Sequence, residues 1–270
     1  MRCTIRIIIA AILLAATNAA LAFDQNHAVW DALLKRHVVV AQNGSFSRID
    51  YAGFHADRSA LQVYLDGLSS VTETEYRGWT REQQLAFLIN AYNAFTVALV
   101  LTRYPDLKSI KDLGSFLRSP WKKEFFMLLG AERSLDAVEQ GLIRAPGAFD
   151  EPRIHFAVNC ASIGCPMLRE NAYVAERLDS QLEESVRRFI GDRSRNRYDP
   201  ASEKLEVSRI FDWYKADFEK GNRGISSLPQ FLARYADFLA DGAAARALVR
   251  QGQAQIRYLD YDWNLNDSKH

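Results

Sequence analysis

One histidine and two cysteines stand close together in this chain, and these residue types can support nucleophilic chemistry. His155, Cys160 and Cys165 lie in the stretch 152–173, which reads PRIHFAVNCASIGCPMLRENAY. A cysteine attacks as its thiolate, so it needs a nearby base, usually histidine, and a third group that orients the imidazole. The spacing therefore predicts that Cys160 is a reactive thiol and that His155 is its base.

The sequence alone leaves the group that orients His155 open. The candidates are Asn159, Glu139, Asp212 and Asp262, and of these we place Asn159 and Glu139 in the catalytic set. Backbone N–H groups at a turn after Cys160 would lower the pKa of its thiol and could serve as an oxyanion hole. Cys165 precedes Pro166, a rigid setting that favours support over attack.

The same residues allow two other interpretations. Cys160 and Cys165 could form a structural disulfide, the default for paired cysteines in an exported protein, although so short a loop would contribute only about 2 kcal/mol. His155 and the two cysteines could also supply three of the four usual zinc ligands. No CxxC or HxxxH spacing supports a metal site, so we expect neither a metal nor another cofactor.

An alternation of polar and apolar residues over 153–159 predicts a half-buried strand beneath this site. Ile154, Phe156 and Val158 would face one side of that strand, and His155 the other. Gly164 and Pro166 break the pattern, because glycine permits positive φ and proline removes a backbone donor. We therefore expect His155 on a rigid strand and Cys160 where the chain turns.

A long apolar helix is the second element that must position the site. Thr80 and Gln83 match a capping box, and residues 85–101 are apolar nearly all round, which predicts a helix buried on several sides. Asn90 and Asn93 within it would each need a hydrogen-bond partner, so we expect both to be buried and bonded near 152–165. The residues expected to contribute to binding are Asn90, Asn93, Arg153, Ser162, Asp212 and Trp213.

The remaining periodicities predict a helix-rich chain with a few short strands. Helical spacing recurs in residues 23–40, 59–68, 134–139, 173–190, 208–218 and 243–250, and Ser227-Leu228-Pro229 is expected to open another helix. Short strands are expected at 125–129, 205–207 and 255–261. The predicted fold is α+β: a helix-rich single domain with a small, mainly antiparallel sheet packed on a buried central helix.

The first residues have the pattern of a secretory signal. Arg2 and Arg6 precede the apolar run 7–16, and Ala20-Leu21-Ala22 is an A-x-A cleavage site. We expect residues 1–22 to be removed and residues 23–270 to form the domain, in the periplasm or secreted. An uncleaved N-terminal anchor is the alternative. Cys3 would leave with the signal.

Composition excludes several partners. The 34 Lys and Arg balance the 33 Asp and Glu, with no basic patch for nucleic acid. We therefore expect no nucleic acid, no membrane contact after signal cleavage, and a monomer that binds a small-molecule, peptide or protein ligand. The chain contains no GxGxxG, P-loop or GxSxG motif.

Several segments resemble bacterial members of the domain of unknown function 547 family. The resembling segments are 87–94 (FLINAYNA), 134–139 (SLDAVE), 152–162 (PRIHFAVNCAS), Cys165-Pro166 and 210–214 (IFDWY). Their order and spacing cover roughly residues 79–218. The family label supplies no activity.

That family is in turn distantly similar to papain-like and transglutaminase-like cysteine hydrolase folds, in which a buried helix packs on a sheet that bears the catalytic histidine. The resemblance implies that His155 is the base. Those enzymes carry their cysteine at the start of the central helix, whereas this helix has only Asn90 and Asn93. The comparison therefore leaves Cys160 as the nucleophile, or else a site without hydrolase activity.

Two hypotheses of different class follow. The first is an exported thiol-dependent acyl hydrolase or transferase that acts on peptide-like amides. The second is a non-catalytic periplasmic binding or scaffold domain in which a Cys160–Cys165 disulfide is structural.

Overall fold

The computed structural model describes residues 22–115 and 119–269, so the expected signal segment lies outside the described residues except for Ala22. The α-helices are α1 (Ala28–His37), α2 (Tyr51–Ala56), α3 (Arg58–Ser70), α4 (Glu73–Arg77), α5 (Arg81–Leu101), α6 (Leu135–Val138), α7 (Leu178–Ile190), α8 (Ile210–Trp213), α9 (Leu228–Ala233), α10 (Ala236–Leu239) and α11 (Ala243–Arg250). The strands are β1 (Val38–Val40), β2 (Ser47–Ile49), β3 (Phe126–Leu128), β4 (Ala131–Arg133), β5 (Arg197–Asp199), β6 (Lys204–Val207) and β7 (Gln255–Tyr258).

Short one-turn helices complete the fold. They are η1 (Ile110–Leu113), η2 (Pro120–Lys122), η4 (Pro152–Phe156), η5 (Ala175–Arg177), η6 (Lys215–Phe218) and η7 (Asn222–Gly224), together with the π-helix η3 (Glu139–Ile143), which directly continues α6.

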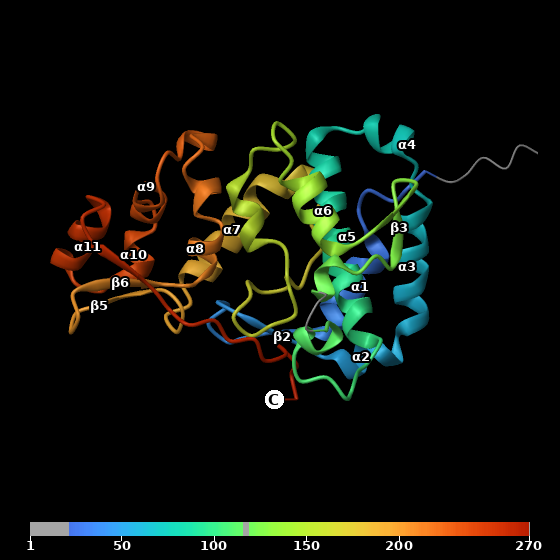
Figure 1. Cartoon of the computed structure of the whole chain (residues 1–270), viewed down its shortest axis with the longest axis horizontal. Coiled ribbons are helices and arrows are strands. Elements are labelled where there is room, and N and C mark those ends of the chain that lie inside the picture. The colour runs from blue at the N-terminus through green and yellow to red at the C-terminus, as the bar shows by residue number, and fades with distance from the viewer. Residues whose placement is uncertain (1–21, 116–118, 270) are drawn as a thin grey trace, which may run out of the picture.

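The chain is an α+β domain, as predicted. Helices α1 to α6 lie at one end of the molecule, α8 to α11 lie with β5 to β7 at the other, and α7 lies between them (Figure 1). The strands form three small sheets: antiparallel β1-β2, antiparallel β3-β4, and β5-β6-β7, in which β7 runs parallel to β6. The strands are therefore mainly antiparallel, as expected, but they form three separate sheets and not one.

Helix α5 is the buried central helix. The hydroxyl of Thr80 accepts the N–H of Gln83, and the Gln83 side chain accepts the N–H of Thr80, which confirms the capping box. Among the described residues, α5 alone is long and apolar enough to cross a membrane, and 89% of that apolar stretch is buried inside the fold. Its apolar surface is therefore used by the core.

Two hydrophobic cores meet at the segment that precedes Cys160. One core surrounds α5 and includes Ile154 and Val158. The other lies among α7 to α11 and contains Phe156, whose ring lies 5.3 Å from that of Phe189 between centroids. The segment is thus buried on both sides, with its side chains shared between two cores.

The prediction of a strand over 153–159 is wrong, because this segment begins with the 3₁₀-helix η4. Proline starts η4, where its missing N–H costs nothing. The carboxylate of Glu151 accepts the N–H of Arg153, and the N–H of Ala157 donates to the carbonyl of Ile154 at 2.9 Å. The apolar side chains of this segment do not share one face, because Ile154 and Val158 enter the first core and Phe156 enters the second.

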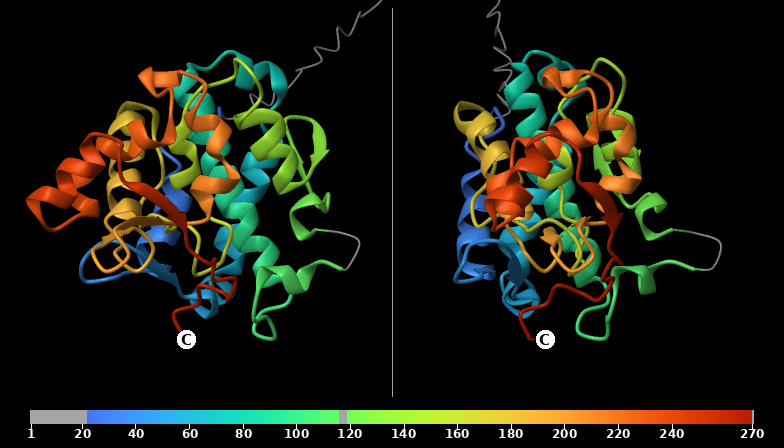
Figure 2. Two further views of the ribbon diagram at one scale, coloured as in Figure 1. Left: turned by 60° about the vertical axis from the view of Figure 1, so that its left-hand side comes forward. Right: turned by 90° about the vertical axis from the view of Figure 1, so that its left-hand side faces the viewer.

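The C-terminal segment returns from β7 to the α5 end of the molecule (Figures 1 and 2). The N–H of Leu265 donates to the carbonyl of Lys108, and the N–H of Asn266 donates to the carbonyl of Ala161. Residues 259–265 consequently run beside the loop that follows Cys160, although the two segments are far apart in the sequence.

Candidate functional site

Cys160 and His155 line the same cleft, which has a volume of about 560 Å³. Apolar and aromatic side chains make up most of its wall, and a few polar groups are set among them, which is typical of ligand sites. The other lining residues are Tyr92, Ser119, Trp121, Asp136, Glu139, Gln140, Arg144, Val158, Cys165, Pro166, Ile210, Trp213, Tyr214, Tyr261 and Trp263.

Hydroxyl groups surround the partly exposed sulfur of Cys160. Its Sγ lies 3.1 Å from the hydroxyl of Tyr261 and 3.2 Å from that of Ser162, and these two hydroxyls are 2.9 Å apart. Ala161, between Cys160 and Ser162, adopts a left-handed conformation with φ 62°. Such a conformation is strained for a residue with a Cβ, and here it turns the chain so that Ser162 comes back to the sulfur.

The pKa of the Cys160 thiol is lowered from 9 to about 7. A hydrogen bond from the Cys165 side chain contributes most, burial opposes it, and Ser162 and Tyr261 lower the pKa further. A substantial fraction of the thiol is therefore ionised at neutral pH, which a nucleophile requires. The expected backbone donors are only partly present: the N–H of Ser162 supports the sulfur, but that of Cys160 donates to Cys165.

Cys165 is buried and supports Cys160. The N–H of Cys160 lies 2.8 Å from Cys165 Sγ, and burial raises the pKa of the Cys165 thiol well above its ordinary value. Both cysteines are free thiols in the structure, so the expected disulfide is not formed there.

His155 is held by Asp217. Its Nε2 lies 2.8 Å from Asp217 Oδ2, and the same carboxylate accepts hydrogen bonds from Arg144 and Lys220, each at 2.7 Å. Burial opposes ionisation of Asp217, but the bonds from His155, Arg144 and Lys220 outweigh it and hold its pKa well below the ordinary value. Asp217 is therefore a stable anion.

The anion fixes the tautomer of the neutral imidazole. Burial lowers the pKa of His155 despite the opposing effect of Asp217, so the ring is neutral at pH 7. An ionised carboxylate can only accept, which puts the single ring proton on Nε2. Nδ1 then carries a free lone pair, and this buried atom has no hydrogen-bond partner among the described residues.

Tyr214 covers one face of the His155 ring. The two rings are stacked with centroids 3.8 Å apart, and the Tyr214 hydroxyl donates to Glu139 Oε1 at 2.7 Å. Glu139 thus reaches the site through Tyr214 and does not bond to His155. No hydrogen bond joins His155 to Cys160 among the contacts of the described chain, so a proton would pass between them through the cleft they share.

Asn159, a predicted catalytic residue, bonds within the Cys160 loop and makes no hydrogen bond to His155 among the contacts of the described residues. It is buried, its Nδ2 donates to the carbonyl of Pro166 at 2.7 Å, and its Oδ1 accepts the N–H of Ala161 at 3.0 Å. The group that bonds to His155 is Asp217, which is not among the four candidates predicted from the sequence. No motif identifies it; it is one acidic residue in the aromatic segment 210–218.

The central helix holds this loop through Asn93, as predicted. Asn93 Nδ2 donates to the carbonyl of Ala157 at 3.0 Å, and its Oδ1 accepts the N–H of Asn159 at 2.8 Å. Asn90 is also buried and fully bonded, but its partner is the backbone of Tyr173 rather than 152–165. Both amides are structural and lie outside the cleft.

The other predicted binding residues fall in different places. Trp213 lines the cleft and is 47% exposed, and Ser162 contacts the sulfur of Cys160. Arg153 is buried in an ion-pair network with Glu151 and Asp179, away from the cleft. Asp212 is exposed and pairs with Arg209 at 3.5 Å.

Four aromatic side chains form one wall of the cleft, which we call the aromatic wall: Trp121, Trp213, Tyr261 and Trp263. Their ring centroids are 4.5 Å apart for Tyr261 and Trp263, 4.9 Å for Trp213 and Tyr261, and 6.0 Å for Trp121 and Trp263. Three separate segments contribute these rings, so only the folded chain assembles the wall.

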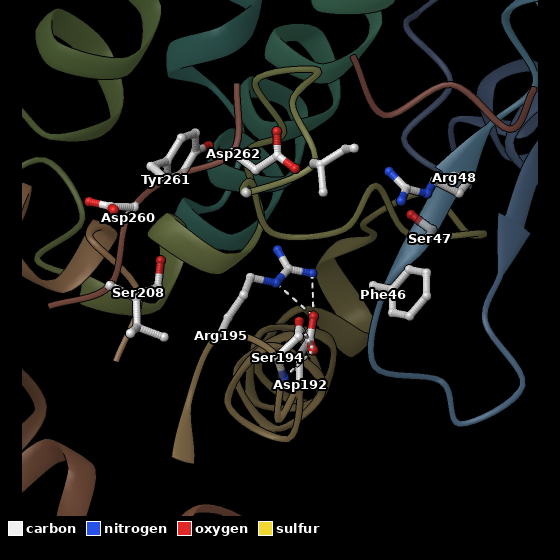
Figure 3. Close-up of a pocket in the computed structure, with 13 residues that line it drawn as sticks. Phe46, Ser47, Arg48, Asp192, Ser194, Arg195, Ser208, Asp260, Tyr261 and Asp262 are labelled. Atoms are coloured by element: carbon white, nitrogen blue, oxygen red, sulfur yellow. Dashed lines mark hydrogen bonds and ion pairs between the residues drawn. The ribbon is translucent and has the colours of Figure 1, made fainter. Parts of the chain in front are cut away.

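Tyr261 also lines a second hollow, of about 280 Å³. In Figure 3, Arg195 lies across this hollow from Phe46, with its guanidinium bonded to Asp192. Arg195 also donates to the carbonyl of Cys165 at 2.6 Å, which supports the loop from behind.

The described residues contain no group of three histidine, cysteine or acidic side chains placed to hold a metal ion. In particular, His155 directs its Nε2 at Asp217 rather than toward the two sulfurs.

Comparison with known proteins gives one match. Residues 76–190 match the model of a family described as a protein of unknown function, DUF547, which supports the resemblance to that family. The matched residues include α5, Glu139, His155 and Cys160, whereas Asp217 and Tyr261 lie beyond them. No curated protein and no solved structure matches the chain.

Proposed function

We propose that this protein is an exported thiol-dependent acyl hydrolase or transferase that acts on peptide-like amides. One observation carries the proposal: a partly exposed thiol whose pKa is lowered to about 7 shares a cleft with a buried histidine that an aspartate orients. A nucleophile, a base and an orienting anion are the three parts of covalent acyl-transfer sites.

In the proposed reaction, the lone pair on His155 Nδ1 takes the proton of the Cys160 thiol, directly or through water in the cleft. The thiolate attacks the amide carbonyl, a C–S bond forms, and the carbonyl electrons move to oxygen. When the tetrahedral species collapses, the C–N bond breaks and the imidazolium gives its proton to the leaving amine. Asp217 stabilises the imidazolium in the interval.

The acyl-enzyme is then a thioester on Cys160. Water, or an acceptor amine in a transferase, gives a proton to His155 Nδ1 and attacks the carbonyl, and the C–S bond breaks to restore the thiolate. The hydroxyls of Tyr261 and Ser162 lie within hydrogen-bond distance of the sulfur, and in this proposal they donate to the developing oxyanion.

The test is covalent trapping. The mature protein is treated without reductant with iodoacetamide and, separately, with activated acyl esters, and the products are mapped by peptide mass spectrometry. Cys160 is expected to react faster than the buried Cys165 and to carry the acyl group. Replacing His155 by Ala should slow release of the acyl group. The proposal is wrong if no acyl adduct forms on Cys160.

A second candidate is a non-catalytic binding or scaffold domain. It is favoured by the complete burial of the His155 side chain beneath Tyr214 and by the proximity of the two cysteines. This alternative predicts that protein purified from the periplasm contains no free thiol and that both cysteines are recovered only as a mutual disulfide.

A further inference from the structure

Two carboxylates line the Cys160 cleft without a cationic partner among the residues that the structure describes. Asp136 and Glu139 both line it, and residues three apart project from the same face of a helix. Glu139 marks the passage from α6 to the π-helix η3, an irregularity that often occurs at functional sites. It is 6% exposed and is bonded by the neutral groups of Tyr214 and Gln140.

Arg144, the arginine among the lining residues, does not neutralise these carboxylates. Its Nε donates to Asp217 at 2.7 Å, and its Nη1 donates to the side-chain oxygen of Gln140. The guanidinium also lies over the ring of Tyr214, 4.9 Å from its centroid. Its charge is therefore directed to Asp217 and not to Asp136 or Glu139.

The aromatic wall adds a second attraction for positive charge. Aromatic faces attract ammonium and guanidinium groups, most strongly when the contact excludes water. One ring of the wall already makes such a contact, because Lys111 Nζ lies 3.5 Å from the centroid of Trp263. Trp213, which is 47% exposed, presents surface that a ligand can cover.

A third observation is an unpartnered acceptor on a residue that lines the cleft. Nδ1 of His155 is buried and has no partner within the described chain, although His155 lines the cleft. Buried polar atoms are nearly always hydrogen-bonded. A hydrogen-bond donor for Nδ1 is therefore expected from a ligand or from its bound water.

From these features we infer that the cleft selects a ligand with a positively charged amine, which lies between the carboxylates of Asp136 and Glu139 and the aromatic wall. Under the proposed function, on which this assignment rests, the substrate is a peptide-like amide with a lysine-like side chain. The amine is a recognition group and does not react; the amide carbonyl lies at Cys160.

The experiment measures binding in the absence of turnover. Titration of the Cys160→Ser variant with N-acetyl-lysine amide and with the uncharged N-acetyl-norleucine amide is followed by tryptophan fluorescence and calorimetry. The lysine compound should bind about tenfold more tightly, which corresponds to about 1.4 kcal/mol. Asp136→Asn and Glu139→Gln should each remove most of this preference. Glu176→Gln, an exposed carboxylate elsewhere on the surface, is the matched control.

Equal binding of the two compounds, or a lysine preference that survives both carboxylate replacements, would overturn the inference. Circular dichroism identifies a variant that is unfolded; in that case salt dependence in the Cys160→Ser protein decides, because only the charged compound should bind more weakly in salt. This outcome can be distinguished from that of the proposed function. If Cys160 forms no acyl adduct but the lysine preference is present, only the proposed reaction is wrong. If Cys160 is acylated but the lysine preference is absent, only the proposed amine site is wrong.

Discussion

His155 and Asp217 are separated by 62 positions in the sequence, yet Nε2 of the imidazole lies 2.8 Å from Oδ2 of the carboxylate. Asp217 belongs to η6, in the second core, whereas His155 belongs to η4, which lies between the two cores. The pair therefore depends on how the two halves of the domain are packed together.

Replacing Asp217 by Asn should lower the free energy of unfolding by about 3 kcal/mol, because it leaves the buried His155 and the partly buried Arg144 without their anion. The pKa of Asp217 is depressed in the folded state. Its contribution to the stability of the fold is therefore present above the pKa of the unfolded state, about 4, and is lost as pH falls toward the pKa of the folded state. Urea unfolding at pH 7 and at pH 3 measures both effects.

Asp237→Asn is the control for that comparison, because Asp237 is an exposed carboxylate that also pairs with arginine. Its loss should cost less than about 1 kcal/mol. If Asp217→Asn and Asp237→Asn unfold at the same urea concentration, the buried anion does not stabilise the fold.

Alkylation of Cys160 should follow a titration with a midpoint near pH 7, where its thiol ionises. Tyr261→Phe removes a donor that stabilises the thiolate, so the midpoint should rise and the rate at pH 7 should fall. Initial rates of iodoacetamide labelling across pH 5 to 10 measure the shift. Tyr258→Phe, a β7 residue without a contact to the sulfur, should leave the midpoint unchanged. An unshifted midpoint in Tyr261→Phe would show that its hydroxyl does not activate the thiol.

Gly164→Ala should impair the site through a steric clash. A Cβ at this position would lie 2.9 Å from Cε2 of Tyr261 and 3.0 Å from the backbone of Asp262. Backbone atoms cannot move aside cheaply, so Tyr261 should shift and its bond to Cys160 should weaken. The measured result is slower labelling of Cys160 at pH 7. At Gly141, where an added Cβ meets no atom within 4 Å, alanine should label at the normal rate.

Asn93→Leu should destabilise the fold by about 2–4 kcal/mol, because it leaves the carbonyl of Ala157 and the N–H of Asn159 unpaired in a buried place. Thermal unfolding measures the loss. Thr96→Val is the matched control on the same helix, since the Thr96 hydroxyl donates only to the carbonyl of Tyr92 one turn earlier. If Asn93→Leu melts at the same temperature as the wild-type protein, the proposed link between α5 and the loop is contradicted.

Expression of the full chain in a Gram-negative host should yield a mature protein that begins at Phe23, because Ala20-Leu21-Ala22 has the pattern of a cleavage site. Intact-mass measurement of the periplasmic fraction checks this. Recovery of a protein that still contains Met1 from the membrane fraction would contradict export by cleavage.

The sequence by itself determined the elements whose causes are local. The capping box at Thr80 and the apolar content of 85–101 were enough to predict α5, and helical spacing predicted α11 with its observed bounds. The buried amide of Asn93 also required hydrogen-bond partners, and the segment 152–165 that supplies them was predicted correctly. Cys160 was recognisable as a candidate thiol because thiol chemistry depends on residue type.

Only the tertiary structure decided what surrounds that thiol. Residues 153–159 alternate as a strand does, but their apolar side chains enter two different cores, and local i→i+3 bonds after Pro152 produce a 3₁₀-helix. Asp217 and Tyr261 reach the site from distant segments. Contacts of this kind depend on the docking of whole elements, and the period of a sequence reports only which face of an element is buried. For that reason the sequence could single out Cys160 as a candidate, whereas Asp217, the hydroxyl groups beside the sulfur and the aromatic wall could not be predicted.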